Sequence, residues 1–228
     1  VYSPSTQLEI SVLNFETGKE QCKLSGHTGV IHNAIFNYDG SKIITGSKDN
    51  SIRVWDSKTG KELNKLTRRG FASTGFNGKI FIGKDDKTIL IQGLQTSPTQ
   101  VWNLETGKSI NLVGVNFLGT PEISPDGKMI AGTGAVMSKK ESINQLVIYN
   151  TATGKQIGSF KGNPGSMYMS FSADSKCLAL TMTDGVDLVD IASEEVKYKL
   201  PHLSVNHYAF SEDRSLIMTY GIDVMSRL

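Results

Sequence analysis

This sequence is short of the residues that cross-link a chain. It has two cysteines, Cys22 and Cys177, which fall in predicted strands of well-separated blocks. A disulfide requires Cα atoms within about 7 Å of each other, so we interpret both residues as small buried thiols. Two unpaired thiols and the lack of an Asn-x-Ser/Thr sequon favour a reducing, intracellular compartment, with the cytoplasm preferred and the nucleus as the alternative.

Long apolar runs and a strong charge of either sign are also missing. No stretch approaches the roughly 20 apolar residues of a membrane-spanning helix, and the formal net charge is only +2. A nearly neutral chain exerts little long-range attraction on nucleic acid or on an anionic membrane. We therefore expect protein partners and no membrane association, and we rank nucleic acid well below protein as a partner.

Motifs for catalysis, cofactor binding and metal binding are incomplete. The stretch 106–109 (TGKS) ends like a phosphate-binding loop, but position 102 is Trp where that loop requires Gly. The stretch 132–134 (GTG) lacks the third glycine of a dinucleotide fingerprint. His27 with His32 could suggest a metal, but residues five apart on a strand point to opposite faces. We predict no catalytic residue, no cofactor, no metal site and no enzyme activity.

The sequence does contain a repeat. From His27 to Lys61 it reads HTGVIHNAIFNYDGSKIITGSKDNSIRVWDSKTGK, in which the Asp-Gly pair between two β-prone runs indicates a hairpin. A Thr-Gly-Lys turn preceded by a β-prone run recurs at spacings of 42, 47 and 47 residues. These turns begin at Thr17, Thr59, Thr106 and Thr153. A period of about 40–47 residues with four strands in each copy is typical of a propeller blade.

At these residues the chain resembles the WD-repeat family of β-propellers. Gly26-His27 opens the best copy, and Trp55-Asp56 closes its third strand. The resemblance implies an all-β fold of four-stranded antiparallel blades, with at least five blades represented and the chain an excerpt of a ring of about seven. It also implies a structural hydrogen-bond network, in which the second-strand hydroxyl is Thr45 or Ser47. The residues of this network are His27, Thr45, Ser47, Asp49 and Trp55.

The other copies depart from this pattern. The third block keeps Trp102, whereas the fourth has Tyr149 and the fifth has Val189 at the matching position. We expect these blades to depend on apolar packing between neighbours. The predicted organisation is one propeller over 1–228, and its parts are a partial blade 1–26, blades at about 27–66, 67–113, 114–161 and 162–200, and a partial blade 201–228.

Irregular loops on one face of the disc form the candidate binding surface. Three stretches carry basic and aromatic side chains, namely the loop 66–78, the long turn 137–145 and the loop 161–168. Arg and aromatic residues often anchor protein interfaces. We expect this basic sector to dock an acidic or phosphorylated segment of a partner, with forked donation from the two arginines; the alternative is a set of solvated loop residues. The candidate partner-binding residues are Arg68, Arg69, Phe71, Lys139, Lys140, Lys161 and Tyr168.

The resemblance implies a non-catalytic interaction scaffold or ligand-sensing domain, as one part of a larger multidomain protein or complex. A second hypothesis is a nucleic-acid-binding propeller that uses the same basic sector, with Phe71 and Tyr168 stacking on bases. A third is a propeller enzyme or small-molecule binder in the central channel. It ranks last, because it would need convergent polar groups on the innermost strands. The sequence leaves the oligomeric state open.

Overall fold

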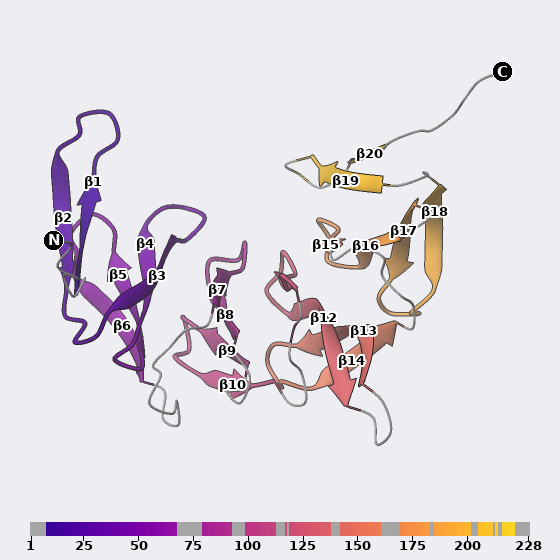
Figure 1. Ribbon diagram of the computed structural model, residues 1–228, viewed down its shortest axis with the longest axis horizontal. Coiled ribbons are helices and arrows are strands. Elements are labelled where there is room, and N and C mark those ends of the chain that lie inside the picture. The colour runs from indigo at the N-terminus through magenta and orange to yellow at the C-terminus, as the bar shows by residue number, and fades with distance from the viewer. Residues whose placement is uncertain are drawn as a thin grey trace, which may run out of the picture. The chain divides into compact units, whose positions relative to one another are not determined.

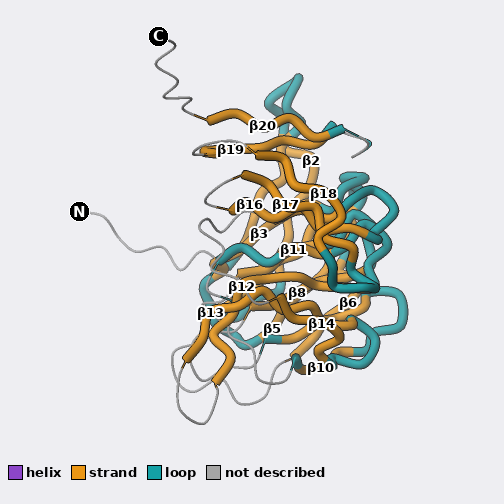
Figure 2. The backbone as a smooth tube through the Cα atoms, turned by 90° about the vertical axis from the view of Figure 1, so that its right-hand side faces the viewer, coloured by secondary structure: helices purple, strands orange, loops and turns teal. Residues whose placement is uncertain are grey.

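The computed structural model describes residues 8–67, 79–92, 99–112, 117, 119–137, 142–160, 169–182, 185–201, 205–211, 213 and 216–221. These residues form β-strands joined by turns and loops (Figures 1 and 2). The strands assemble into antiparallel meanders of up to four strands. The predicted fold class, an all-β chain built from four-stranded antiparallel blades, is confirmed.

In every sheet, each strand pairs with its neighbours in the sequence. Four of the sheets formed by the described residues have four strands, and two have two strands. The four-stranded sheets are β3 (Ile31–Phe36), β4 (Lys42–Ser47), β5 (Ser51–Asp56) and β6 (Glu62–Thr67); β7 (Lys79–Ile82), β8 (Thr88–Gln92), β9 (Gln100–Asn103) and β10 (Ser109–Asn111); β11 (Glu122–Ile123), β12 (Met129–Met137), β13 (Ser142–Asn150) and β14 (Gln156–Phe160); and β15 (Met169–Phe171), β16 (Cys177–Met182), β17 (Gly185–Asp190) and β18 (Val196–Pro201). The two-stranded sheets are β1 (Glu9–Leu13) with β2 (Glu20–Ser25), and β19 (Val205–Phe210) with β20 (Ile217–Gly221).

The chain divides into two compact units. The first contains residues 1–82 and 89–109, and the second contains residues 83–88 and 110–228. In the first unit, one face of the β3–β6 sheet packs its apolar side chains against β7, β8 and β9. The other face of the β3–β6 sheet packs against β1 and β2. In the second unit, the sheets β11–β14 and β15–β18 share a core that includes Ile148, Phe171 and Leu178. Burial of each such side chain contributes about 1.5–3 kcal/mol.

The middle strands of a blade are buried on both faces, whereas its last strand is largely exposed. Almost every residue of β4 and β5 is buried, but β6 alternates between exposed and half-buried positions. The same burial on both faces explains the apolar run Ile89–Ile91 in β8, because a strand covered on both faces has no solvent side on which to place polar residues.

The repeated Thr-Gly-Lys turn follows from local hydrogen bonding. The Asp56 carboxylate accepts from the amide and the hydroxyl of Thr59, and the Gly60 amide donates to the Asp56 carbonyl. Gly60 then takes a φ of +73°, where a Cβ atom is disfavoured. Gly18, Gly107 and Gly154 repeat this conformation, and Glu194 adopts it in the fifth copy with a φ of +58°.

Two sequence-based expectations are wrong in detail. Cys22 and Cys177 are free thiols, as expected, but both are half-buried rather than buried, because Cys22 lies on β2, which is largely exposed, and Cys177 stands at the end of β16. The stretch 137–145 is not one long turn, since β12 continues to Met137 and β13 begins at Ser142, and the two residues pair. Backbone pairing between two adjacent strands has extended the sheet into the region expected to be a loop.

Candidate functional site

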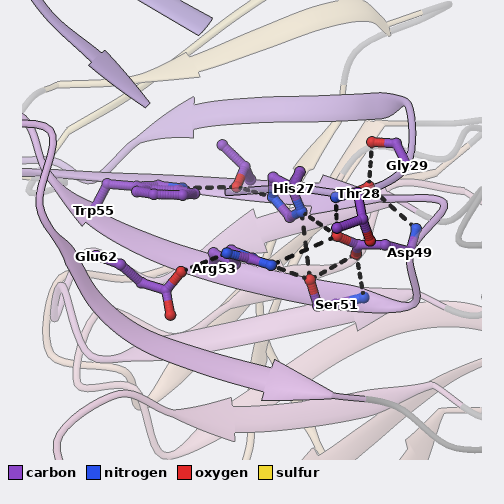
Figure 3. A network of polar contacts seen from close by, with 10 residues as sticks. His27, Thr28, Gly29, Asp49, Ser51, Arg53, Trp55 and Glu62 are labelled. Carbon is purple, nitrogen blue, oxygen red and sulfur yellow. Dashed lines mark hydrogen bonds and ion pairs between the residues drawn. The ribbon is translucent and has the colours of Figure 1, made fainter. Parts of the chain in front are cut away.

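A network of polar contacts in the β3–β6 sheet includes His27, Asp49 and Trp55 (Figure 3). It centres on the Thr45 hydroxyl. The Trp55 indole Nε1 donates to Thr45 Oγ1 over 2.8 Å. Thr45 Oγ1 lies 2.7 Å from His27 Nε2, and His27 Nδ1 lies 2.8 Å from Asp49 Oδ2. Four side chains therefore form one continuous path, and they come from the connection before β3, from β4, from the β4–β5 turn and from β5.

The backbone positions these groups through register and one tight contact. Thr45 on β4 is opposite Arg53 on β5, which places Trp55 two residues further along the same face. His27 lies in the connection that precedes β3, next to Gly26. Gly26 has a φ of +150°, and a Cβ atom there would lie 2.5 Å from Arg53 Nη1. The glycine before His27 is thus required for a steric reason, since a larger residue would displace the Arg53 guanidinium.

Asp49 anchors the outer end of this path in the turn between β4 and β5. Its carboxylate accepts from the amides of Thr28 and Ser51 and from the Ser51 hydroxyl, which lies 2.6 Å away. The Asp49 side chain is only 7% exposed. Burial by itself would raise the pKa of Asp49, but the hydrogen bonds from Ser51, His27 and the Thr28 amide hold that pKa well below its ordinary value.

Arg53 and Glu62 extend the path to the surface, and the sequence reasoning missed both. Arg53 Nη1 lies 2.7 Å from Glu62 Oε2, and Nη2 lies 3.8 Å from Asp49 Oδ2. The guanidinium carbon is 5.8 Å from the centre of the Trp55 ring, within the range of a cation–π contact. The sequence held a signal for this ion pair. Arg53 stands two residues before Trp55 and so shares its face of the strand, and Trp55 pairs with Glu62 on the next strand.

The hydrogen bonds assign the protonation state of His27. Thr45 Oγ1 accepts the indole proton. The Asp49 carboxylate can only accept, so Nδ1 of His27 carries a proton, and in the neutral ring Nε2 is the acceptor of the Thr45 hydroxyl proton. The Nδ1–H group donates to Asp49. Burial lowers the pKa of His27 even though the hydrogen bond and the charge of Asp49 act in the opposite direction. The pair is therefore a neutral imidazole bonded to a carboxylate.

The remaining predicted residues have different places. Ser47 is buried near the path, but its hydroxyl donates to the Gly29 carbonyl over 2.7 Å, so Thr45 and not Ser47 contacts His27 and Trp55. The candidate partner-binding residues Arg68, Arg69, Phe71, Lys139, Lys140, Lys161 and Tyr168 all lie outside the described residues.

The sheet β7–β10 keeps the tryptophan and loses its acceptor. The first hairpin is closed by the bond from Asn37 N to Lys42 O in the β3–β6 sheet and by the bond from Gly83 N to Thr88 O in this sheet. Thr45 stands three residues after Lys42, and Ile91 stands three residues after Thr88. Ile91 therefore occupies the position of Thr45. Trp102 is as buried as Trp55, yet its Nε1 has no hydrogen-bond partner within the described part of the chain. Such an unsatisfied buried donor costs about 1–3 kcal/mol.

The sheet β11–β14 replaces the polar path with aromatic packing. The same count places Gly132 at the Thr45 position and Tyr149 at the Trp55 position. The Phe117 ring fills the space beside Gly132, since a Cβ atom on Gly132 would lie 2.3 Å from that ring. The rings of Phe117 and Tyr149 meet edge to face, with their centres 6.4 Å apart. In β15–β18 the matching residues are Leu180 and Val189, both within an apolar core.

A comparison of the two tryptophans tests the value of the Thr45 hydrogen bond. We expect Trp55→Phe to lower the free energy of unfolding by about 1–3 kcal/mol more than Trp102→Phe does. Both changes remove a similar buried volume, but only the first breaks a hydrogen bond. Urea denaturation of the two variants measures the difference, and equal losses would contradict the assignment.

The described residues hold no cluster of three or more His, Cys, Asp or Glu side chains suited to a metal ion. Among the same residues, no helix has the length and hydrophobicity to cross a membrane.

Comparisons with known proteins point to one family. The model of the WD domain, G-beta repeat, matches residues 18–56, which include most of the path. Eukaryotic translation initiation factor 3 subunit I from Danio rerio is 38% identical over 66 residues, covering 28% of this chain and 20% of that protein. The same subunit from Homo sapiens is 38% identical over 65 residues, covering 27% and 20%. The matched region thus spans about a fifth of these relatives. Residues 18–56 therefore carry a WD repeat, and the neighbouring four-stranded blades, in which the repeat pattern has changed, are similar to those of WD-repeat proteins.

Proposed function

We propose that this chain is a non-catalytic interaction module and part of a multiprotein assembly. The observation that carries the proposal is that its reactive side chains are used internally. His27, with a side chain 1% exposed, has both ring nitrogens occupied, and Asp49 and Arg53 are nearly as buried. Groups held in this way face one another and brace the blade.

The similarity to relatives named as a subunit of a translation initiation factor supports an assembly role. The same name fits the proposed intracellular, cytoplasmic location. The match covers 20% of those relatives. A link of this chain to translation initiation is therefore a proposal. The division of the chain into blades at the boundaries predicted above also remains a prediction.

The finer proposal is that the basic sector docks an acidic or phosphorylated segment of a protein partner. It is supported by the residue types in the sequence, since Arg donates two parallel hydrogen bonds to a carboxylate or a phosphate. The charges concerned are those of Arg68, Arg69, Lys139, Lys140 and Lys161.

Affinity purification of the tagged natural protein tests both levels of the proposal. We expect a small set of stoichiometric proteins that is lost when Arg68 and Arg69 are both changed to Glu. The matched control changes Lys58 and Lys61 to Glu, because these exposed lysines flank a regular blade turn. Partners that survive the arginine change would refute the docking site and leave the assembly role standing.

The other outcomes separate the competing hypotheses. Recovery of RNA without stoichiometric proteins, lost steeply as salt is raised, would favour nucleic-acid binding. Recovery of neither protein nor RNA would contradict the assembly role.

A further inference from the structure

The connection that precedes β3 is held to the turn between β4 and β5 by a small set of contacts. We call residues 26–30 the 26–30 segment. Besides the bond from His27 to Asp49, the Thr28 amide donates to Asp49 Oδ2 over 3.0 Å. The Ser47 hydroxyl donates to the Gly29 carbonyl, and the Lys48 amide donates to the Val30 carbonyl over 2.9 Å. The imidazole of His27 is the only side chain of the segment in these bonds.

These bonds favour the neutral form of His27, with the proton on Nδ1. If Nε2 gained a proton, both ring nitrogens would be donors. Thr45 Oγ1 would then accept from both His27 Nε2 and Trp55 Nε1, and its own hydroxyl proton would lose the acceptor that Nε2 provides in this buried position. A buried donor without an acceptor is costly, so a proton on the ring destabilises the closed arrangement.

Charges on the neighbouring strands also act on the ring. Asp49 in the β4–β5 turn attracts a positive charge, and so does the more distant Glu62 on β6, whereas Arg53 on β5 repels it. Arg53 is itself held by Glu62 and lies 3.8 Å from the Asp49 carboxylate, which weakens the attraction of that carboxylate for His27. Removal of the ring from water is the dominant effect and opposes the charged form.

We propose that the 26–30 segment is an acid-sensitive latch, which opens when His27 takes up a proton from solvent while the β3–β6 sheet remains paired. Protonation itself breaks the bond from the Thr45 hydroxyl to His27 Nε2, and opening then breaks the other bonds that hold the segment. In the open form the charged ring reaches water, and the amides of Thr28 and Lys48 lose their acceptors. This inference does not depend on the proposed function.

The direction of the pH effect follows from linkage. The closed form disfavours the charged ring, so its pKa for His27 lies below the ordinary value of about 6.5 that the open form has. The closed form is thus fully stable above that pH and loses stability as the pH falls through it, because the open form binds the extra proton. The opening equilibrium should rise about tenfold between pH 7.5 and pH 5.5.

Amide hydrogen exchange measured by NMR on the full chain, with rates normalised to intrinsic exchange, tests the latch. We expect protection of the Thr28 and Lys48 amides to fall about tenfold between pH 7.5 and 5.5. The amides of Asp56 and Gly60, in the opposite turn of the same blade, should change little. His32→Gln, which removes an exposed histidine on β3, should leave the pH dependence intact, and His27→Gln should abolish it.

A second readout does not require a variant to fold. Ring ¹⁵N shifts of His27 in the unmodified protein at pH 7.5 should report a neutral ring with the proton on Nδ1. A doubly protonated ring at that pH would overturn the proposal, and so would protection of Thr28 and Lys48 that is independent of pH.

Discussion

Asp49→Ala is expected to lower the free energy of unfolding by about 3–5 kcal/mol, the usual loss when one member of a buried charged network is removed. The change deprives the Thr28 and Ser51 amides and His27 Nδ1 of their acceptor. It also leaves the Arg53 charge with Glu62 as its remaining carboxylate neighbour in this network. Urea denaturation at pH 7.5 measures the loss.

Asp56→Ala is the matched control. Asp56 also closes a turn and accepts three hydrogen bonds, from the Lys58 amide and from the amide and hydroxyl of Thr59. Its carboxylate faces solvent, so water replaces the lost interactions and the loss of stability should be much smaller. Similar losses in the two variants would show that turn closure, and not the buried path, is what Asp49 contributes.

Asp49→Asn separates the charge of Asp49 from its shape. The amide keeps one oxygen acceptor and replaces the other oxygen with a donor, which would face the donors of His27, Thr28 or Ser51. We expect a loss that approaches that of the alanine variant. A nearly unaffected Asn variant would mean that the negative charge contributes little.

The glycines of the Thr-Gly-Lys turns are expected to differ sharply, although the turns look alike in the sequence. A Cβ atom on Gly60 would lie 2.3 Å from the Lys23 carbonyl oxygen, and one on Gly154 would lie 2.6 Å from the Asn111 carbonyl oxygen. Gly107 has nearly the same φ, but a Cβ atom there would meet nothing within 4 Å. All three positions disfavour a side chain, and two of them also press on a neighbouring strand.

We therefore expect Gly60→Ala and Gly154→Ala to lower the free energy of unfolding by about 2–4 kcal/mol, the sum of backbone strain and overpacking. Gly107→Ala should cost only about 1–2 kcal/mol, from strain alone. Thermal or urea denaturation of the three variants provides the test. Equal losses would mean that the turns do not contact the preceding strand as described.

Much of the fold could be predicted because its signals are local. The Asp56 side chain accepts from Lys58 and Thr59, and Gly60 supplies the positive φ, so the turn is encoded within five positions. Repetition of such turns at 42 and 47 residues was enough to predict four-stranded blades. The start of β13 was placed too late, because pairing of Met137 with Ser142 depends on the partner strand and not on local turn residues.

The candidate site was predictable only in part. His27, Asp49 and Trp55 could be named from the repeat pattern, but the choice between Thr45 and Ser47 depends on which hydroxyl faces the indole. Arg53 and Glu62 were missed, because their pairing over 2.7 Å links adjacent strands across the face of a sheet.

Repeated four-stranded blades were predictable from the residues alone, because turn chemistry and strand alternation act over a few positions. How each blade is held together depends on the folded chain. The Thr45 hydroxyl satisfies Trp55, Trp102 next to Ile91 has no acceptor among the described residues, and Phe117 occupies the space above Gly132. Each of these outcomes depends on atoms brought together from distant positions, where packing and the need to satisfy buried polar groups select the arrangement.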